Sequence, residues 1–118
     1  ECLSLLEKGV VEAEALDEIV QYSIGVRMAL NGPLRQRDLN GLDTHLHIAR
    51  YLYPDLDARD KPAAILVDYV DQGRQGAKSG RGFYHWSEES HAQHQVQERE
   101  NLQRIIKIAT QHISKEKS

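Results

Sequence analysis

Apolar side chains recur every three or four residues along most of this chain, the spacing that places them on one face of an α-helix. The pattern is clearest in five segments: residues 3–10, 15–24, 42–53, 62–70 and 102–108. No two neighbouring segments show the strict alternation of apolar and polar residues that marks half-buried strands. The pattern therefore predicts an all-α fold, a small helical bundle of about five helices.

Glycine and proline mark the expected ends of these helices. Gly9 predicts the end of the first helix and Gly25 the end of the second. Asn31-Gly32-Pro33 predicts a turn, with a new helix beginning at Pro33. Pro54 is expected to close the third amphipathic segment. Pro62 is expected to start the next one, with these side chains pointing inward: Ile65, Leu66, Tyr69 and Val70.

A glycine-rich stretch precedes the last helix. Four glycines fall within ten residues, at positions 73, 76, 80 and 82, a density that no helix tolerates. A short aromatic segment, Phe83-Tyr84-His85-Trp86, follows, and we expect its rings to fold back onto the helices. Ser87 then offers an N-cap for the final helix.

Composition narrows the class of protein. The chain has 118 residues, enough for one domain, with 28% charged residues and a formal net charge of −3. Nothing in this composition predicts nucleic-acid binding, and no apolar run approaches the roughly 20 residues of a membrane helix. A single cysteine excludes an internal disulfide and fits a reducing, cytoplasmic setting. Because Glu1 begins inside a helical pattern, we expect the chain to be part of a longer polypeptide.

No residue type gives an evident active site. His91 and His94 can share a helix face, but a metal site needs three or four ligands, so we predict none. Cys2 lies in an apolar stripe, where a buried structural thiol is expected. Residues 73–82 contain Gly, Lys and Ser, but they follow a helix instead of a strand, which argues against a nucleotide-hydrolysing phosphate loop. A basic loop that touches an anionic group stays open.

Three motifs in a fixed order are more specific than any single residue. They are Gly32-Pro33-Leu34, Gly41-Leu42-Asp43 and Lys78-Ser79-Gly80-Arg81-Gly82-Phe83-Tyr84. Their order resembles the C-terminal domain of the 3-hydroxyacyl-CoA dehydrogenases, over roughly residues 1–86. Residues 4–11 also look like the family's first long helix and its exit.

The resemblance implies a parent enzyme of fatty acid metabolism that oxidises a 3-hydroxy group to a 3-keto group. In such enzymes an N-terminal Rossmann domain binds NAD and supplies the His–Glu pair that moves the proton. The helical domain closes the substrate cleft and forms the homodimer, and its functional Asn would lie upstream of Glu1. No dinucleotide fingerprint occurs in this chain, so we expect the chain alone to bind no NAD and to carry no catalytic residue.

The resemblance suggests five residues for the substrate cleft: Pro33, Leu34, Arg37, Lys78 and Arg81. For Lys78 and Arg81, ordinary solvated loop charges are an equal alternative. Leu34 replaces the family's frequent Phe, and Arg35-Gln36-Arg37 is more polar than a long acyl chain favours. The substrate therefore stays open between an acyl-CoA and a small hydroxy acid.

Two further expectations concern partners. The chain has more apolar faces than one small core covers, so we expect a homodimer, with much of the contact supplied by the helices between Ala15 and Tyr53. The alternative function is a non-catalytic helical protein-interaction module. Such a module accounts for the helices and the surface charge but not for the order of the three motifs.

Overall fold

The fold, taken from a computed structural model, is described for residues 1–117, with side chains placed through Gln111. Its α-helices are α1 (Cys2–Glu7), α2 (Ala13–Val20), α3 (Val26–Met28), α4 (Pro33–Asn40), α5 (Leu42–Leu52), α6 (Ala64–Asp71) and α7 (Glu88–Lys117). A π-helical turn, Gln21–Gly25, joins α2 to α3, so the seven segments form six continuous helices. The predicted all-α fold is confirmed, and within residues 1–117 no strand forms.

Several predicted helix ends are confirmed by their local geometry. Gly9 follows α1 with φ 67°, a left-handed conformation that favours glycine. Pro33 is the first residue of α4. At the start of α7, Ser87 Oγ accepts a hydrogen bond from the Ser90 backbone N–H at 2.9 Å, and Ser90 Oγ accepts one from the Ser87 N–H at 2.9 Å. This reciprocal pair satisfies two backbone donors and fixes where α7 begins.

Two predicted boundaries are wrong. Gly25 does not end the second helix, because its backbone stays helical (φ −57°, ψ −50°) and the chain continues through the π turn to Met28. A glycine inside a helix costs only about 1 kcal/mol, which its neighbours offset. Pro62 does not start α6 either. The helix begins two residues later, after Ala63, whose extended conformation makes it the N-cap.

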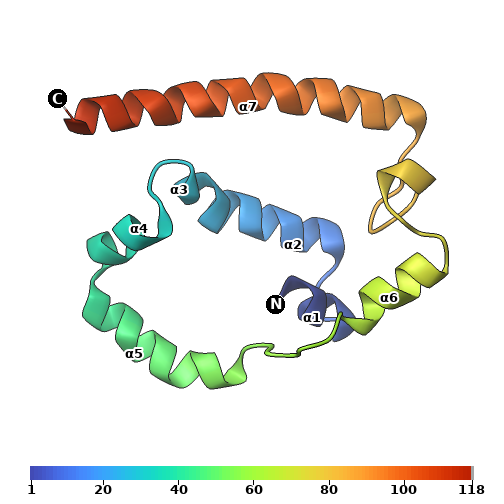
Figure 1. Cartoon of the computed structure of the whole chain (residues 1–118), viewed down its shortest axis with the longest axis horizontal. Coiled ribbons are helices and arrows are strands. Elements are labelled where there is room, and N and C mark those ends of the chain that lie inside the picture. The colour runs from blue at the N-terminus through green and yellow to red at the C-terminus, as the bar shows by residue number, and fades with distance from the viewer. Residues whose placement is uncertain (118) are drawn as a thin grey trace.

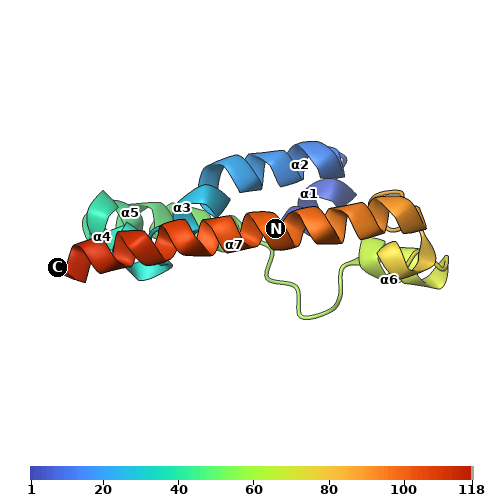
Figure 2. The same ribbon diagram turned by 90° about the horizontal axis from the view of Figure 1, so that it is seen from above.

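The helices form a flat, open arrangement. Figure 1 shows α2 to α6 following one another around a ring, with α1 beside α6 and α7 running along one side for nearly the full length. Seen from above in Figure 2, the same helices lie in a shallow layer. The radius of gyration is 18.2 Å, and the extents are 50 × 40 × 22 Å. A compact domain of this length has a radius of about 13.5 Å, so the chain does not close on itself.

The open shape leaves most apolar side chains uncovered. The accessible surface is 9845 Å², whereas a compact protein of 13.4 kDa exposes about 6,500 Å². Among the described side chains, the buried apolar ones are Leu16 and Ala63. Leu66 and Val70, predicted to point inward, are 41% and 49% exposed, and Cys2 is exposed instead of buried. These three errors share one cause: within residues 1–117, no element covers the faces on which these side chains lie.

Candidate functional site

The two arms of the glycine-rich loop between α6 and α7 meet at Gly76 and Gly82. The Gly76 N–H donates to the Arg81 carbonyl at 3.0 Å, which brings the two arms of the loop together. Gly82 is buried at this crossing, and a Cβ added to it would lie 2.8 Å from Gly76 Cα. Only a residue without a side chain fits there. Lys78, in a 3-10 turn over Ala77–Ser79, lies at the exposed tip of the loop.

Arg74 fastens this loop to α6. Its guanidinium donates to the Gly82 carbonyl at 2.7 Å, and its central carbon lies 3.5 Å from the centre of the Tyr69 ring. The Tyr69 ring in turn lies 5.4 Å from the Phe83 ring. A cation–π contact and a contact between two rings therefore both attach the loop to Tyr69 on α6. Sequence reasoning missed Arg74, because its partner is eight residues away and no local pattern connects the two.

The rings of the aromatic segment fold back onto the helices, as predicted, and they contact three of them: α2, α6 and α7. The Trp86 ring lies 5.8 Å from the His91 ring and 5.5 Å from the His94 ring, both on α7. The Tyr84 hydroxyl donates to Asp17 Oδ2, on α2, at 2.5 Å. The loop, α2 and the start of α7 are therefore held in one place. Asp17 was not foreseen, since it is 67 residues from Tyr84 along the chain.

The contact between Tyr84 and Asp17 predicts a measurable titration. The Asp17 carboxylate accepts a hydrogen bond from the phenol, and this bond, aided by slight desolvation, raises the pKa of Tyr84 from 10.0 to about 12. Because the pKa is raised in the folded state, the bond stabilises the fold fully below pH 10 and is lost as the pH rises through about 12. NMR titration of labelled tyrosine is expected to show this value, and a lower one in Asp17→Asn.

Glu18→Gln is the matched control for that titration. The negative charge of Glu18 disfavours the Tyr84 phenolate only weakly and is the smallest cause of its raised pKa. This variant is therefore expected to leave the pKa of Tyr84 nearly unchanged. Equal effects of the two substitutions would contradict a direct hydrogen bond to Asp17.

The five predicted cleft residues fall into two groups. Pro33, Leu34 and Arg37 lie on α4, whereas Lys78 and Arg81 lie in the glycine-rich loop. Figures 1 and 2 agree that α4 and this loop are at opposite ends of the longest axis. Within one chain the structure therefore does not bring the two groups together. All five residues are exposed, Leu34 to 79%.

Arg37 has a partner that sequence reasoning missed. Its guanidinium lies 3.1 Å from Nδ1 of His45, on α5. Since an arginine only donates hydrogen bonds, Nδ1 of His45 is the acceptor in this contact. The contact holds Arg37 across the junction of α4 and α5. This contact gives His45, one of the six histidines, a structural role that requires no metal.

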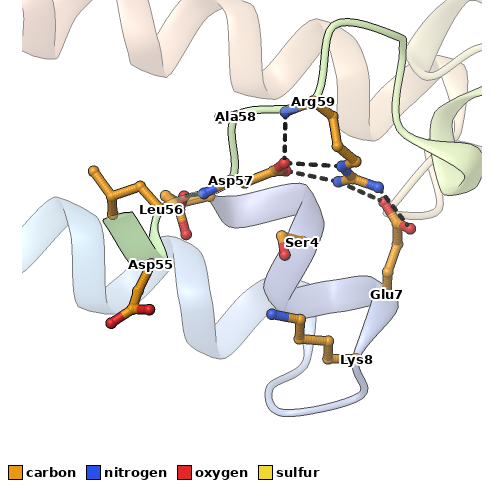
Figure 3. A pocket seen from close by; sticks show the side chains of 9 residues that line it. Ser4, Glu7, Lys8, Asp55, Leu56, Asp57, Ala58 and Arg59 are labelled. Atoms are coloured by element: carbon orange, nitrogen blue, oxygen red, sulfur yellow. Dashed lines mark hydrogen bonds and ion pairs between the residues drawn. The ribbon is translucent and has the colours of Figure 1, made fainter. Parts of the chain in front are cut away.

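A polar hollow of about 550 Å³ lies between α1 and the segment of residues 55–59 (Figure 3). Arg59 donates to Asp57 at 2.7 Å and to Glu7 at 3.2 Å, which fastens the segment before α6 to α1. Hydrogen bonds from Arg59 lower the pKa of Asp57 from 3.8 to about 2. Because Arg59 already pairs with both carboxylates, the cluster has the character of a structural clasp.

A second hollow is apolar and lies between two helices that are far apart in sequence. Its volume is about 480 Å³, and its walls are formed by the π turn with α3 on one side and by α7 on the other. The apolar side chains that line it are Tyr22, Val26, Leu30, Ile105 and Ile108. Each of these is between 42% and 78% exposed, so the groove is an uncovered contact surface.

Two further kinds of site are absent from the described part of the chain. No three His, Cys, Asp or Glu side chains lie together in a way that would hold a metal ion there. Over the same residues, no helix has both the length and the apolar character needed to cross a bilayer.

Comparison with known proteins gives one family. Residues 1–86 match the family model described as 3-hydroxyacyl-CoA dehydrogenase, C-terminal domain. The chain is 34% identical over 89 residues to a 5-formyl-3-hydroxy-2-methylpyridine 4-carboxylate 5-dehydrogenase of Mesorhizobium japonicum, covering 75% of this chain and 29% of that one. It is 38% identical over 91 residues to a probable 3-hydroxybutyryl-CoA dehydrogenase of Bacillus subtilis, covering 76% and 31%. This match favours the dehydrogenase interpretation over an interaction module.

A solved structure extends the likeness to α7. The crystal structure of a 5-formyl-3-hydroxy-2-methylpyridine 4-carboxylic acid 5-dehydrogenase, described as an NAD+-dependent dismutase, matches 95% of this chain with a TM-score of 0.84 and 28% identity. Because α7 has 30 residues, most of it lies inside that match. The chain spans about a third of the length of these relatives: 29% and 31% of the curated proteins and 35% of the solved one.

Proposed function

We propose, because this chain belongs to the family of 3-hydroxyacyl-CoA dehydrogenase C-terminal domains, that it is the helical substrate-side domain of an NAD-dependent, homodimeric, cytoplasmic dehydrogenase. The parent enzyme oxidises a hydroxyl group to a carbonyl group. An N-terminal Rossmann domain binds NAD, and the present helices cover the substrate. The observation that carries this proposal is the large surface that the chain leaves uncovered.

The uncovered surface is too large for one ordinary partner. The chain exposes about 3,300 Å² more than a compact protein of its mass. A standard interface covers about 800 Å² on each partner, and an obligate one about 1,000–2,500 Å². Two covering surfaces, a preceding domain and a second copy of the chain, account for the excess together. Neither alone does so at ordinary interface sizes.

The chain's own residues do not fit NAD. A dinucleotide site needs a glycine loop that follows a strand and opens a helix, so that the pyrophosphate meets the helix N-terminus. Here the glycine-rich loop follows α6 and turns back on itself at Gly76 and Gly82. NAD, which accepts the hydride when it is bound, is therefore assigned to the other domain. The present chain contributes binding and closure.

The charged candidates suggest what the substrate carries. Lys78 and Arg81 are exposed on the loop that Arg74 fastens to α6, whereas Arg37, which contacts His45, lies at the opposite end of the chain. Positioned cations of this kind attract a carboxylate or a phosphate without joining in proton transfer. The polar run Arg35-Gln36-Arg37 on α4 also disfavours a long acyl chain. We infer a preference for short or charged substrates, whether free hydroxy acids or short acyl-CoA esters.

Replacing both Lys78 and Arg81 by Ala tests this assignment in the full-length enzyme. The double variant is expected to raise KM about tenfold, because two cations near an anionic group contribute roughly 1–2 kcal/mol together. Its melting temperature is expected to change little, since both side chains are exposed. Steady-state kinetics and a thermal melt decide the matter.

Arg74→Ala provides the contrasting variant. Arg74 is held between Tyr69 and Gly82, so its loss is expected to lower stability through the loop. If Lys78 and Arg81 behave like Arg74, moving the melting temperature and leaving KM unchanged, the loop is a structural plug without a substrate role.

A further inference from the structure

The contact between Arg37 and His45 places a titratable ring beside a candidate cleft residue. Arg37 is exposed on α4, and His45 is half-buried on α5. One nitrogen of the guanidinium lies 3.1 Å from Nδ1 of the imidazole. Gly41, with φ 101°, is the one residue between these helices, and the chain turns there (Figure 1). The contact therefore spans the turn and ties the tip of Arg37 to the next helix.

His45 holds Arg37 in this way only while its ring is neutral. A guanidinium offers hydrogen-bond donors and no acceptor, so Nδ1 of the imidazole must accept. A protonated imidazole carries an N–H on both nitrogens and accepts nothing. Protonation therefore removes the acceptor and sets two positive groups 3.1 Å apart, which repel each other. The contact exists above the range in which histidine ordinarily titrates, about pH 6.5, and is lost below it.

The surroundings of His45 offer little to stabilise an added positive charge. Its Nε2 is buried and has no hydrogen-bond partner among the described residues, and no carboxylate pairs with the ring there. A buried charge without a partner is unfavourable. The other charged or titratable groups on the two helices are Arg35, Asp38, Asp43, His47 and Arg50. Of these, the Asp43 carboxylate lies beside Gly41 and the His47 ring contacts Tyr51.

We propose that neutral His45 is a positioning residue, which holds Arg37 ready for a carboxylate or phosphate of the substrate and releases it when protonated. Ordering a flexible side chain on binding weakens affinity roughly two- to tenfold, and a side chain that is already held avoids this loss. The affinity for an anionic substrate is therefore expected to fall as the pH drops through about 6.5. The proposal rests on the proposed function, in which Arg37 belongs to the substrate cleft, and adds the residue that controls it.

Steady-state kinetics of the parent enzyme with a short 3-hydroxyacyl-CoA, at about pH 7.5 and about pH 5.5, test this role on either side of the histidine range. His45→Asn is the informative variant, because Oδ1 of Asn takes the place of Nδ1 as an acceptor and does not titrate. Between the two pH values, the KM of the wild type is expected to rise roughly two- to tenfold more than the KM of His45→Asn. The two proteins are expected to show the same change in kcat, since Arg37 binds substrate and moves no proton. An equal rise of KM in both proteins overturns the proposal.

Arg37→Ala and His47→Asn are the two controls. Arg37 is exposed, so its loss is expected to leave the fold intact, to raise KM at the higher pH and to abolish the additional pH dependence. In that background His45→Asn is expected to have no further effect on KM, because His45 acts through Arg37. His47 lies on the same helix but contacts Tyr51, so His47→Asn is expected to keep the pH dependence of the wild type. Loss of that dependence in His47→Asn, or an effect of His45→Asn in the absence of Arg37, contradicts the proposal.

The role of His45 and the proposed function fail in different ways. A parent enzyme that transfers no hydride at either pH contradicts the dehydrogenase and, with it, this role of His45. An active enzyme in which the wild type and His45→Asn respond equally to pH contradicts the role of His45 alone. A double-mutant cycle of Arg37→Ala and His45→Ala on thermal stability reports the contact without activity: coupling is expected at the higher pH and not at the lower one. Coupling of equal size at both pH values, or at neither, overturns the proposal.

Discussion

Replacing Gly82 by Ala is expected to lower the protein's free energy of unfolding by roughly 1–3 kcal/mol, the usual cost of overfilling a packed site. The added Cβ would lie 2.8 Å from Gly76 Cα and 3.1 Å from Gly76 N, both backbone atoms that have little room to move. Relief requires the two arms of the loop to separate. That separation would break the bond from Arg74 to the Gly82 carbonyl and displace Tyr84 and Trp86 from α2 and α7.

Gly32→Ala is the matched control for this loss. Gly32 has an ordinary φ of −64°, and a Cβ there meets nothing within 4 Å. Ala is a weaker N-cap than Gly, but it also reduces the conformational freedom of the unfolded chain. Because these two effects oppose each other, the free energy of unfolding is expected to change by no more than about 0.5 kcal/mol. Thermal melts of the two variants measure the difference. Equal losses would show that the crossing of the loop at Gly76 and Gly82 is not a tight contact.

The second large effect concerns the chain on its own. Residues 1–118 alone are expected to bind no NAD and to transfer no hydride. The only glycine-rich loop in the described structure follows α6 and is closed by its own hydrogen bonds. Neither the Tyr84–Asp17 pair nor the Arg37–His45 pair lies beside a site for a dinucleotide: the first joins the glycine-rich loop to α2, and the second joins α4 to α5. Acid–base groups and positioning supply most of the rate enhancement in such a reaction. We therefore expect no hydride transfer by residues 1–118 alone.

Local chemistry made much of this fold predictable. The turn before Pro33 and the cap at Ser87 depend on residues within four positions of each other, and both are as predicted. The Gly25 boundary failed because a glycine is a weak helix stop when the flanking residues favour the helix. A local rule does not register the change to π-type bonding there.

Which side chains are buried, and which residues form the candidate site, depend on long-range contacts that the spacing of apolar residues does not reveal. The apolar spacing of α6 correctly indicates a helix, but it does not say whether anything covers Leu66 and Val70. Likewise, Arg74 and Asp17 gain their roles from partners that only the folded loop brings near. The family motifs marked the loop itself, because a Cβ at Gly82 would collide with the backbone of Gly76 where the two arms of the loop cross.

One measurement tests the central claim most directly: NADH formation from NAD+ and a short 3-hydroxyacyl-CoA, followed for residues 1–118 alone and for the proposed parent polypeptide with its N-terminal Rossmann domain. The account predicts turnover with the longer polypeptide and none with residues 1–118, because this chain supplies only the helical cover. Turnover by residues 1–118 alone would contradict the assignment of NAD to a separate domain. Absence of turnover in both, with short acyl-CoA and with small hydroxy acids, would contradict the dehydrogenase itself.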